Sequence, residues 1–434
     1  MTFRFHPSKT ILSGALFLLL LPGAAAQRTA NHPYKGAMLQ TQDLRVTFIR
    51  RLQNYNPSAP DHDPGVMSPK SVHVHPSGQK YYINSLEGCL TLAYDFSSGE
   101  KLATIRHDIG PEHAALWAPA SGLFPFHHTY KTPDVFTGKP VESTFSHNGH
   151  YLWVPYYRRS FDINAQDPSA LAVIDTEADT LVRLFETGPL PKMIATSPDG
   201  SRIAVTHWGD NTVGMLDISS DQPEDWHYSN CYIVDYQLQL NFSLTAPVNR
   251  DRSSGYCLRG TLFTPDGRYL LVGCMGGGGG IAVIDIQQGL YLGRLLGMMP
   301  NLRHIIICGE YLYASINNAG YVQRIPLSDL YEAIGRLDGK TAQLGGWVNC
   351  KVPAGARTIT ASPDGRYIYV ACHAGNCLAV VDAASMKLIG TVPADSFPVG
   401  LDVSKDGRYV FLTSQAEQGV GGNAVDIYRV EYLR

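Results

Sequence analysis

The chain has 434 residues and a formal net charge of −3, with 35 lysines and arginines against 38 acidic residues. This balance leaves no basic excess to neutralise phosphates, so it argues against nucleic acid as a partner. A chain of this length would usually form two or three domains, unless internal repeats join it into one. Its eight cysteines are typical of an oxidising compartment.

Residues 1–26 have the features of a secretory signal peptide. A short basic region precedes an apolar run at residues 11–21, and three alanines ending at Ala26 provide a cleavage site. The apolar run is too short to span a bilayer, and no later stretch is long and apolar enough to do so. We therefore expect an exported protein, in the periplasm, at the cell surface or outside the cell. Its mature chain would have no transmembrane segment and would begin with an extension at residues 27–43.

A short turn recurs seven times along the rest of the chain. Most copies resemble Ser-Pro-Asp-Gly, in which proline pre-sets φ, aspartate bonds to the backbone and glycine supplies a positive φ. The fifth copy is shortened and is identified by its flanking strands. The seven turns are His75-Pro76-Ser77-Gly78, Ser146-His147-Asn148-Gly149, Ser197-Pro198-Asp199-Gly200, Thr264-Pro265-Asp266-Gly267, Cys308-Gly309-Glu310, Ser362-Pro363-Asp364-Gly365 and Ser404-Lys405-Asp406-Gly407. One unit repeated at intervals of roughly 40–70 residues predicts a propeller or another array.

Each turn joins the first two of four predicted strands, as the sixth unit shows most clearly. Its strands are predicted at residues 358–362, 366–372, 377–382 and 387–392, which are rich in β-branched and aromatic residues. The third strand ends in an aspartate, as it does in three other units. We interpret these carboxylates as caps of the following turn rather than as catalytic groups. They are Asp175, Asp217, Asp285 and Asp382.

The sixth unit also carries a family resemblance, in SPDGRYIYVA at residues 362–371 and LAVVD at residues 378–382. Close copies lie at residues 197–217 and 264–285. On these residues the chain resembles the YVTN-repeat, or YncE-like, seven-bladed β-propellers. The resemblance extends over residues 44–434 and implies an all-β fold of four-stranded blades. It indicates the fold and says almost nothing about function.

The two ends of the repeat region complement each other. The seventh unit ends after its third strand, at residues 423–432, so its blade lacks an outer strand. Residues 44–52 form a predicted strand that precedes the first unit. We expect this N-terminal strand to complete the seventh blade and close the ring, which removes exposed sheet edges. The prediction is a single propeller domain over residues 44–434.

Three insertions interrupt the repeats, at about residues 106–140, 218–258 and 328–346. Long loops on a rigid scaffold often carry binding residues. The last insertion contains a predicted short helix at residues 330–337. The first contains a group of aromatic residues that we expect to form an exposed surface for a partner or ligand. These aromatic residues are Trp117, Phe124, Phe126 and Tyr130.

No motif in the chain identifies a catalytic residue, a cofactor or a metal. The histidines lack the spacing of a zinc site, and the glycine run at residues 276–280 lacks the Lys-Ser/Thr of a phosphate loop. No Gly-x-Ser-x-Gly nucleophile elbow is present. We therefore predict no cofactor, no metal ligand and no assigned catalytic residue. Cys372 and Cys377 flank a four-residue hairpin, and we expect them to form a cross-strand disulfide.

One position of the repeat carries a cation unusually often. It lies eight residues before the turn glycine, at the start of the innermost strand. Blades two and seven have Val141 and Val399 there, whereas the other five blades have Lys70, Lys192, Arg259, Arg303 and Arg357 once the shorter fifth turn is allowed for. Innermost strands line the central channel, so these charges would repel each other at one mouth unless an anion, or carboxylates such as Glu142, lay there. We add His207 and His373, from loops expected on the same face, to the predicted ligand site.

These observations favour an exported binding or scaffolding module of the cell envelope, with a cationic channel mouth for an anionic ligand. The partner would be a protein, or an anionic small molecule or glycan. An alternative is a lactonase-like or lyase-like propeller enzyme, in which the same channel-mouth site stabilises a developing oxyanion. A redox-partner subunit is a third interpretation, which the cysteine and histidine content permits.

Overall fold

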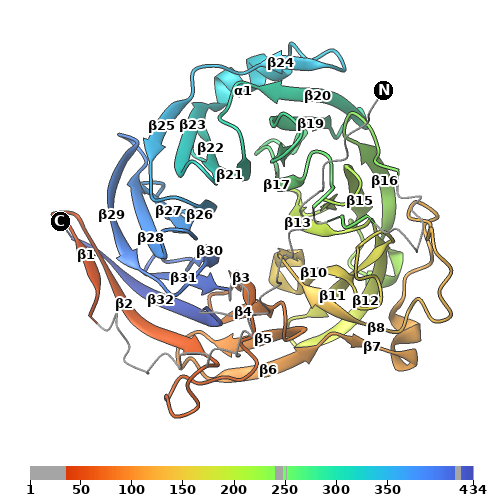
Figure 1. Ribbon diagram of the computed structural model, residues 1–434, viewed down its shortest axis with the longest axis horizontal. Helices are drawn as coiled ribbons and strands as arrows, with labels where there is room; N and C mark the ends of the chain where they lie inside the picture. The colour runs from red at the N-terminus through yellow and green to blue at the C-terminus, as the bar shows by residue number, and fades with distance from the viewer. Residues whose placement is uncertain (1–35, 240–247, 251, 416–421, 434) are drawn as a thin grey trace, which may run out of the picture. The chain divides into compact units, whose positions relative to one another are not determined.

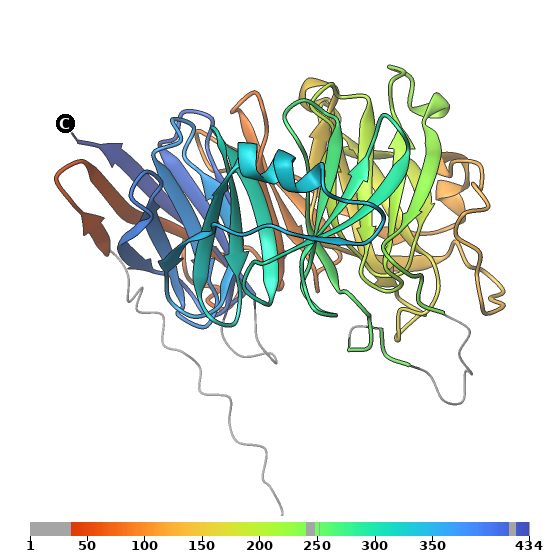
Figure 2. The ribbon, with the colours of Figure 1, turned by 90° about the horizontal axis from the view of Figure 1, so that it is seen from above.

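In the computed structural model, seven β-sheets are arranged around a central axis (Figure 1). The structure describes residues 36–239, 248–250, 252–415 and 422–433, all within the unit Tyr34–Arg434. The sheets stand side by side as upright blades (Figure 2). The fold is therefore the predicted all-β, seven-bladed propeller. The predicted signal peptide lies outside the described residues.

The first four blades follow the chain in order. Blade one contains β3 (Pro69–Val74), β4 (Lys80–Ser85), β5 (Leu90–Asp95) and β6 (Lys101–Arg106). Blade two contains β9 (Thr144–Ser146), β10 (Tyr151–Arg159), β11 (Ser169–Asp175) and β12 (Thr180–Thr187), with β8 (Phe136–Pro140) and β7 (Asp108–Ile109) added beside β10. Blade three contains β13 (Pro191–Thr196), β14 (Arg202–His207), β15 (Thr212–Asp217) and β16 (His227–Ile233). Blade four contains β17 (Leu258–Phe263), β18 (Tyr269–Cys274), β19 (Ile281–Asp285), β20 (Leu290–Leu296) and the parallel β24 (Thr341–Gln343).

The last three blades complete the ring. Blade five contains β21 (Leu302–Cys308), β22 (Tyr311–Ile316), β23 (Tyr321–Pro326) and β25 (Val348–Lys351). Blade six contains β26 (Ala356–Ala361), β27 (Tyr367–Cys372), β28 (Cys377–Asp382) and β29 (Lys387–Pro393). Blade seven contains β30 (Pro398–Val403), β31 (Tyr409–Ser414), β32 (Ala424–Tyr432), β2 (Leu44–Gln53) and β1 (Met38–Gln40). The N-terminal strand β2 pairs antiparallel with β32, which confirms the predicted closure.

The helices are short and lie between strands. The helix α1 (Leu327–Ile334) follows β23 and buries one face against blades four and five, three residues earlier than predicted. The 3-10 helices are η1 (Pro111–Leu116), η2 (His147–Gly149) and η3 (Pro223–Asp225). The segment predicted as an insertion at residues 218–258 contains β16, so part of it is the outer strand of blade three.

The repeated turn is held by the hydrogen bonds that its residue types allow. In blade six, Ser362 Oγ donates to Asp364 Oδ1 at 2.5 Å, and the amide of Tyr367 donates to Ser362 Oγ at 3.0 Å. Gly365 adopts φ +70°, a conformation that glycine adopts without strain. The same side-chain bond recurs in the turns of blades three, four and seven. Local chemistry therefore holds the turn between the first two strands in these four blades.

The aspartates that end the third strands cap the next turn, as interpreted from the sequence. Asp382 Oδ1 accepts hydrogen bonds from the backbone amide and the hydroxyl of Ser385, at 2.7 and 2.6 Å. Asp175, Asp217 and Asp285 accept equivalent bonds from the residues that follow them. These carboxylates therefore stabilise turns of the fold by accepting hydrogen bonds from backbone amides.

Apolar side chains fill the space between neighbouring blades. Trp153 and Phe185 of blade two, for example, pack with Ile203 and Val205 of blade three. In blade six, Cys372 and Cys377 stand directly opposite each other in the β27–β28 pair, as the hairpin predicted. Both carry free thiols, so the predicted disulfide is not formed.

Candidate functional site

The five predicted cations occupy equivalent places in their blades. Each is the second residue of the innermost strand. They are Lys70 in β3, Lys192 in β13, Arg259 in β17, Arg303 in β21 and Arg357 in β26. Val399 has the same place in β30, whereas Val141 precedes β9. The offset counted from the turn glycine therefore marks one structural position.

A β-bulge lies at this position, which sequence analysis missed. The strand register shifts between Pro69 and Ser71 in blade one and between Pro191 and Met193 in blade three. Blades four, five, six and seven shift at the corresponding residues. A bulge takes a residue out of the ladder and re-aims its side chain. In five of these six blades the displaced segment contains the cation.

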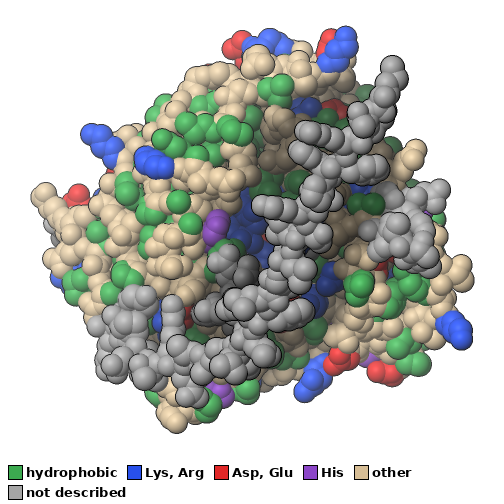
Figure 3. Space-filling model, viewed as in Figure 1, with side chains coloured by type: hydrophobic (Ala, Val, Ile, Leu, Met, Phe, Trp, Pro, Cys, Tyr) green, Lys and Arg blue, Asp and Glu red, His purple; other side chains and the backbone are tan. Residues whose placement is uncertain are grey.

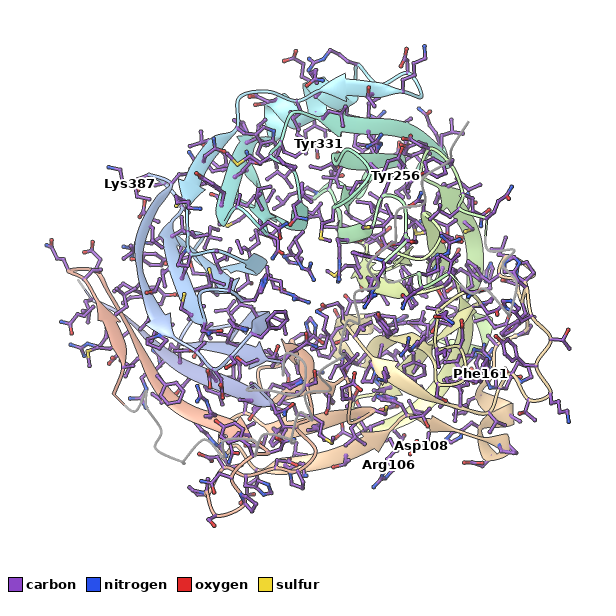
Figure 4. The ribbon with its side chains drawn as sticks, viewed as in Figure 1. Arg106, Asp108, Phe161, Tyr256, Tyr331 and Lys387 are labelled. Carbon is purple, nitrogen blue, oxygen red and sulfur yellow. The ribbon has the colours of Figure 1, made fainter. Side chains whose placement is uncertain are left out.

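Four of the cations line one cavity of about 280 Å³. They are Lys70, Lys192, Arg259 and Arg357. Figure 3 shows lysine and arginine side chains inside the hollow at the centre of the face it presents. Figure 4 shows side chains with nitrogen tips reaching inward from several blades, whereas the labelled Arg106 and Asp108 lie at the outer edge of the ring. Lys139, Arg158 and Glu87 also contribute to the lining.

Lys70 is bonded to the buried carboxylate of Glu142. Its Nζ lies 2.9 Å from Glu142 Oε1, and the two side chains are 7% and 10% exposed. Burial lowers the pKa of Lys70 to about 7; Glu142 opposes this shift, and Arg357 and Arg259 add to it. Burial acts to raise the pKa of Glu142, but the Lys70 ammonium outweighs it and holds that pKa below its usual range. Glu142 therefore stays ionised and neutralises one charge of the cluster.

The other cations also act on each other's ionisation. Burial, followed by repulsion from Arg259 and Lys70, holds the pKa of Lys192 well below its ordinary value. Burial and the nearby guanidinium groups lower the pKa of Arg303 in the same way. Burial and Arg259 lower the pKa of Arg357 to about 9, so its guanidinium is still charged at neutral pH. The five side chains thus converge on one electropositive region.

Aromatic rings contact three of the cations. Lys192 Nζ lies 3.8 Å from the ring centroid of Tyr157, and Arg259 Cζ lies 4.7 Å from that of Trp208. Arg357 Cζ lies 5.4 Å from the centroid of Phe397. Such cation–π contacts offset part of the cost of burying like charges. Sequence analysis missed Tyr157 and Phe397.

The two predicted histidines lie in different surroundings. His373 lies beside the cluster: its ring packs on Phe397, and burial followed by the charge of Arg357 lowers its pKa to about 4. The structure does not support the predicted ligand role of His207. That ring is fully buried, with Thr187 Oγ1 and Thr212 Oγ1 at 2.8 and 2.7 Å from its two nitrogens. Its ring therefore bonds to β12 of blade two and β15 of blade three, and it is not among the residues that line the cavity.

Of the four aromatic residues predicted to be exposed in the 106–140 segment, Phe124 is buried and the other three are half-buried. Phe124 is only 6% exposed and packs edge-on against His207 and Tyr228. Trp117 and Phe126 pack on the guanidinium of Arg159, with ring centroids 5.2 and 4.9 Å from Cζ. These rings attach the segment to blades two and three.

Two further features of the described residues concern metal ions and membranes. In the described part of the chain, no cluster of three or more His, Cys, Asp or Glu side chains is arranged to hold a metal ion. None of the helices within the described ranges is long and apolar enough to cross a membrane.

Comparison with solved structures identifies the fold class. A chain of Kuenenia stuttgartiensis hydrazine synthase aligns with a TM-score of 0.59 and 14% identity, over 87% of this chain and 99% of that one. The Cps50 (Swd1) propeller domain of Myceliophteria thermophila aligns with a TM-score of 0.58 and 11% identity, over 84% and 97%. A chain of a mitotic checkpoint complex aligns with a TM-score of 0.57 and 12% identity, over 96% and 99%. No protein-family model and no curated protein matches the sequence.

These likenesses define the chain as a β-propeller. At such low identity they show the architecture alone. The YVTN-repeat resemblance therefore stays an interpretation of the turn and strand motifs.

Proposed function

We propose that this protein is an exported binding or scaffolding module of the cell envelope that holds an anionic ligand at its channel mouth. One observation carries the proposal: Lys70, Lys192, Arg259 and Arg357 meet in one cavity. Among the described residues that line it, Glu87 is the one acidic side chain. The region therefore has a large excess of positive charge, although the chain as a whole is slightly acidic.

An anion relieves the energetic cost of this arrangement. Burying like charges together is unfavourable, and a bound carboxylate, sulfate or phosphate offsets both the burial and the repulsion. The planar guanidinium groups of Arg259 and Arg357 suit bidentate contacts with such groups. A volume of about 280 Å³ suits a small anion, or the anionic group of a glycan or of a protein.

The scaffolding and export parts of the proposal have separate support. A propeller presents a rigid ring of loops, and one structural neighbour belongs to a complex according to its title. Export rests on the leader-like residues 1–26. N-terminal sequencing of the secreted protein should give a chain that begins at Gln27. An unprocessed protein that stays in the cytoplasm would refute the export part.

Arg259→Met/Arg357→Met tests anion binding directly. Sulfate and citrate should raise the melting temperature of the native protein. At a hundredfold excess over Kd, a bound anion adds roughly 2.7 kcal/mol to the free energy of unfolding. The double variant should lose this response, because its two bidentate donors are gone. Its melting temperature without anion should be unchanged or raised, since two buried like charges are removed.

The matched control is Arg366→Met/Arg408→Met, which removes two exposed arginines from the repeated turns. Sulfate also stabilises proteins by exclusion from their surface, and this control measures that general effect. The control should respond to anions as the native protein does. Equal responses in all three proteins would refute the proposal.

A further inference from the structure

Two lysine–glutamate pairs border the cavity, and they differ in burial. Lys70 and Glu142 are 2.9 Å apart, with side chains 7% and 10% exposed. Lys139 and Glu87 are 2.6 Å apart, with side chains 26% and 49% exposed. Both lysines line the same cavity as Lys192, so a ligand in it would meet two buried amines, Lys70 and Lys192, and the more exposed amine of Lys139. Of the two buried amines, Lys70 has the Glu142 carboxylate at its nitrogen.

We propose that Lys70 is a nucleophilic amine that forms an imine with a small 2-oxo acid, whose carboxylate is held by Arg259 and Arg357. The inference rests on the proposed anion-binding function and specifies the class of ligand. Arginine and lysine side chains share the cavity wall, which suits a molecule whose carboxylate is adjacent to a carbonyl carbon.

The surroundings of Lys70 favour the neutral amine, which is the nucleophilic form. Burial is the largest cause of the lowered pKa of Lys70, and the charges of Arg357, Arg259 and Arg303 lower it further. A pKa of about 7 makes the neutral fraction of Lys70 at pH 7 roughly a thousandfold larger than that of an ordinary lysine. Desolvation beside other cations is an established way to activate a lysine for imine formation.

Glu142 provides the proton transfers that the reaction needs. The lone pair of the Lys70 nitrogen attacks the carbonyl carbon, and the π electrons of the carbonyl move to its oxygen. Glu142 accepts one proton from the nitrogen and delivers it to the alkoxide oxygen, which gives the carbinolamine. It then carries the second nitrogen proton to the hydroxyl, which leaves as water while the C=N bond forms. Amine and ketone thus give imine and water, with no oxidant or reductant. The 2.9 Å contact places Glu142 Oε1 at the reacting nitrogen.

Reductive trapping tests this assignment on the full chain. The protein is incubated at pH 7 with pyruvate or glyoxylate and cyanoborohydride, and is then digested for peptide mass mapping. Reduction of the imine leaves a stable secondary amine on the lysine that reacted. We expect the adduct on Lys70 in preference to Lys139, and much less adduct with acetone, which lacks the carboxylate.

Three variants sharpen the test. Lys70→Arg should abolish the adduct, because a guanidinium forms no imine under these conditions. Arg259→Met/Arg357→Met should reduce it although Lys70 is present. Lys80→Arg, in a lysine–aspartate pair at the other end of blade one, should keep it. If Lys70→Arg fails to fold, the mapping of the native protein decides.

The outcomes separate this inference from the proposed function. An adduct on Lys192, or equal labelling of Lys139 and other exposed lysines, overturns the assignment to Lys70. Absence of any adduct on Lys70 while sulfate still raises the melting temperature overturns the inference and leaves anion binding in place. Loss of the sulfate response in the native protein refutes anion binding itself.

Discussion

His107 and His207 are completely buried, and hydroxyl groups hold both rings. His107 lies between Thr91 Oγ1 and Tyr156 Oη, at 2.8 and 2.9 Å, and His207 lies between two threonines in the same way. Burial lowers the pKa of each ring to about 3. Both histidines are therefore neutral parts of the core at physiological pH.

We predict that these two histidines make the protein less stable in acid. Their pKa is about 6.5 in the unfolded chain and about 3 in the folded one, so the unfolded state binds more protons in between. Their contribution is complete above about pH 6.5 and is lost as the pH falls toward 3, by about 1.4 kcal/mol per pH unit for each ring. Urea unfolding at pH 7.5 and pH 5 measures this loss.

Substitution separates the two rings from other acid-labile groups. His107→Gln and His207→Gln should each lower stability at pH 7.5 and weaken its dependence on pH. His227→Gln, at an exposed position, should change neither. A pH dependence that is the same in all four proteins would contradict the prediction.

Sequence periodicity located the cation cluster but could not describe its surroundings. The offset from the turn glycine identified five side chains because the repeat forces them into equivalent places. His207 was expected in a loop, whereas it is the last residue of β14, where its ring bonds to two threonines. Contacts such as Lys192 with Tyr157 join residues far apart in the chain, and no local pattern encodes them.

At the scale of elements, Arg159 joins the 106–140 segment to the end of β10. Its side chain is fully buried, and its Cζ lies 4.9 Å from the ring centroids of both Phe126 and Phe136. Asp134 pairs with its Nη1 at 3.1 Å. The guanidinium therefore forms the centre of a small aromatic cluster.

We predict that Arg159→Met loosens this segment and leaves the propeller folded. Methionine keeps apolar volume but loses the cation–π contacts, which are worth about 2 kcal/mol when desolvated, and it leaves Asp134 unpaired. Limited proteolysis should then cut the chain between residues 118 and 135 faster than in the native protein. Arg158→Met, next in sequence but only half-buried, serves as the control and should not increase cleavage.

The elements were largely predictable because their turns depend on local chemistry. The Ser-Pro-Asp-Gly bonds involve residues at most five apart, so the motif alone fixes where strands one and two of a blade meet. The fifth strand β24 and the bulges were not predictable, because both arise from packing between elements. Aromatic exposure in the 106–140 segment was misjudged for the same reason.

At the scale of the whole molecule, the ring is closed by the pairing of β2 with β32. Two ion pairs join these strands. Arg51 is buried and donates two hydrogen bonds to Asp426, with Nε–Oδ1 and Nη2–Oδ2 distances of 2.5 and 2.9 Å. Arg45 reaches Glu431 at 3.5 Å, with side chains 35% and 41% exposed. The same strand pair thus contains a buried and an exposed version of one interaction.

We predict that Arg51→Met destabilises the entire propeller by about 3–5 kcal/mol, because it leaves the buried carboxylate of Asp426 without its bidentate partner. Arg45→Met, the matched control on the same two strands, should cost about 0–1 kcal/mol, as exposed pairs do. Arg51→Met/Asp426→Leu should recover part of the loss, since an apolar pair removes the uncompensated charge. Urea unfolding followed by circular dichroism measures all three. Because β2 closes the ring, the loss should lower the midpoint of one cooperative transition; equal effects of Arg51→Met and Arg45→Met would show that the buried pair does not secure the closure.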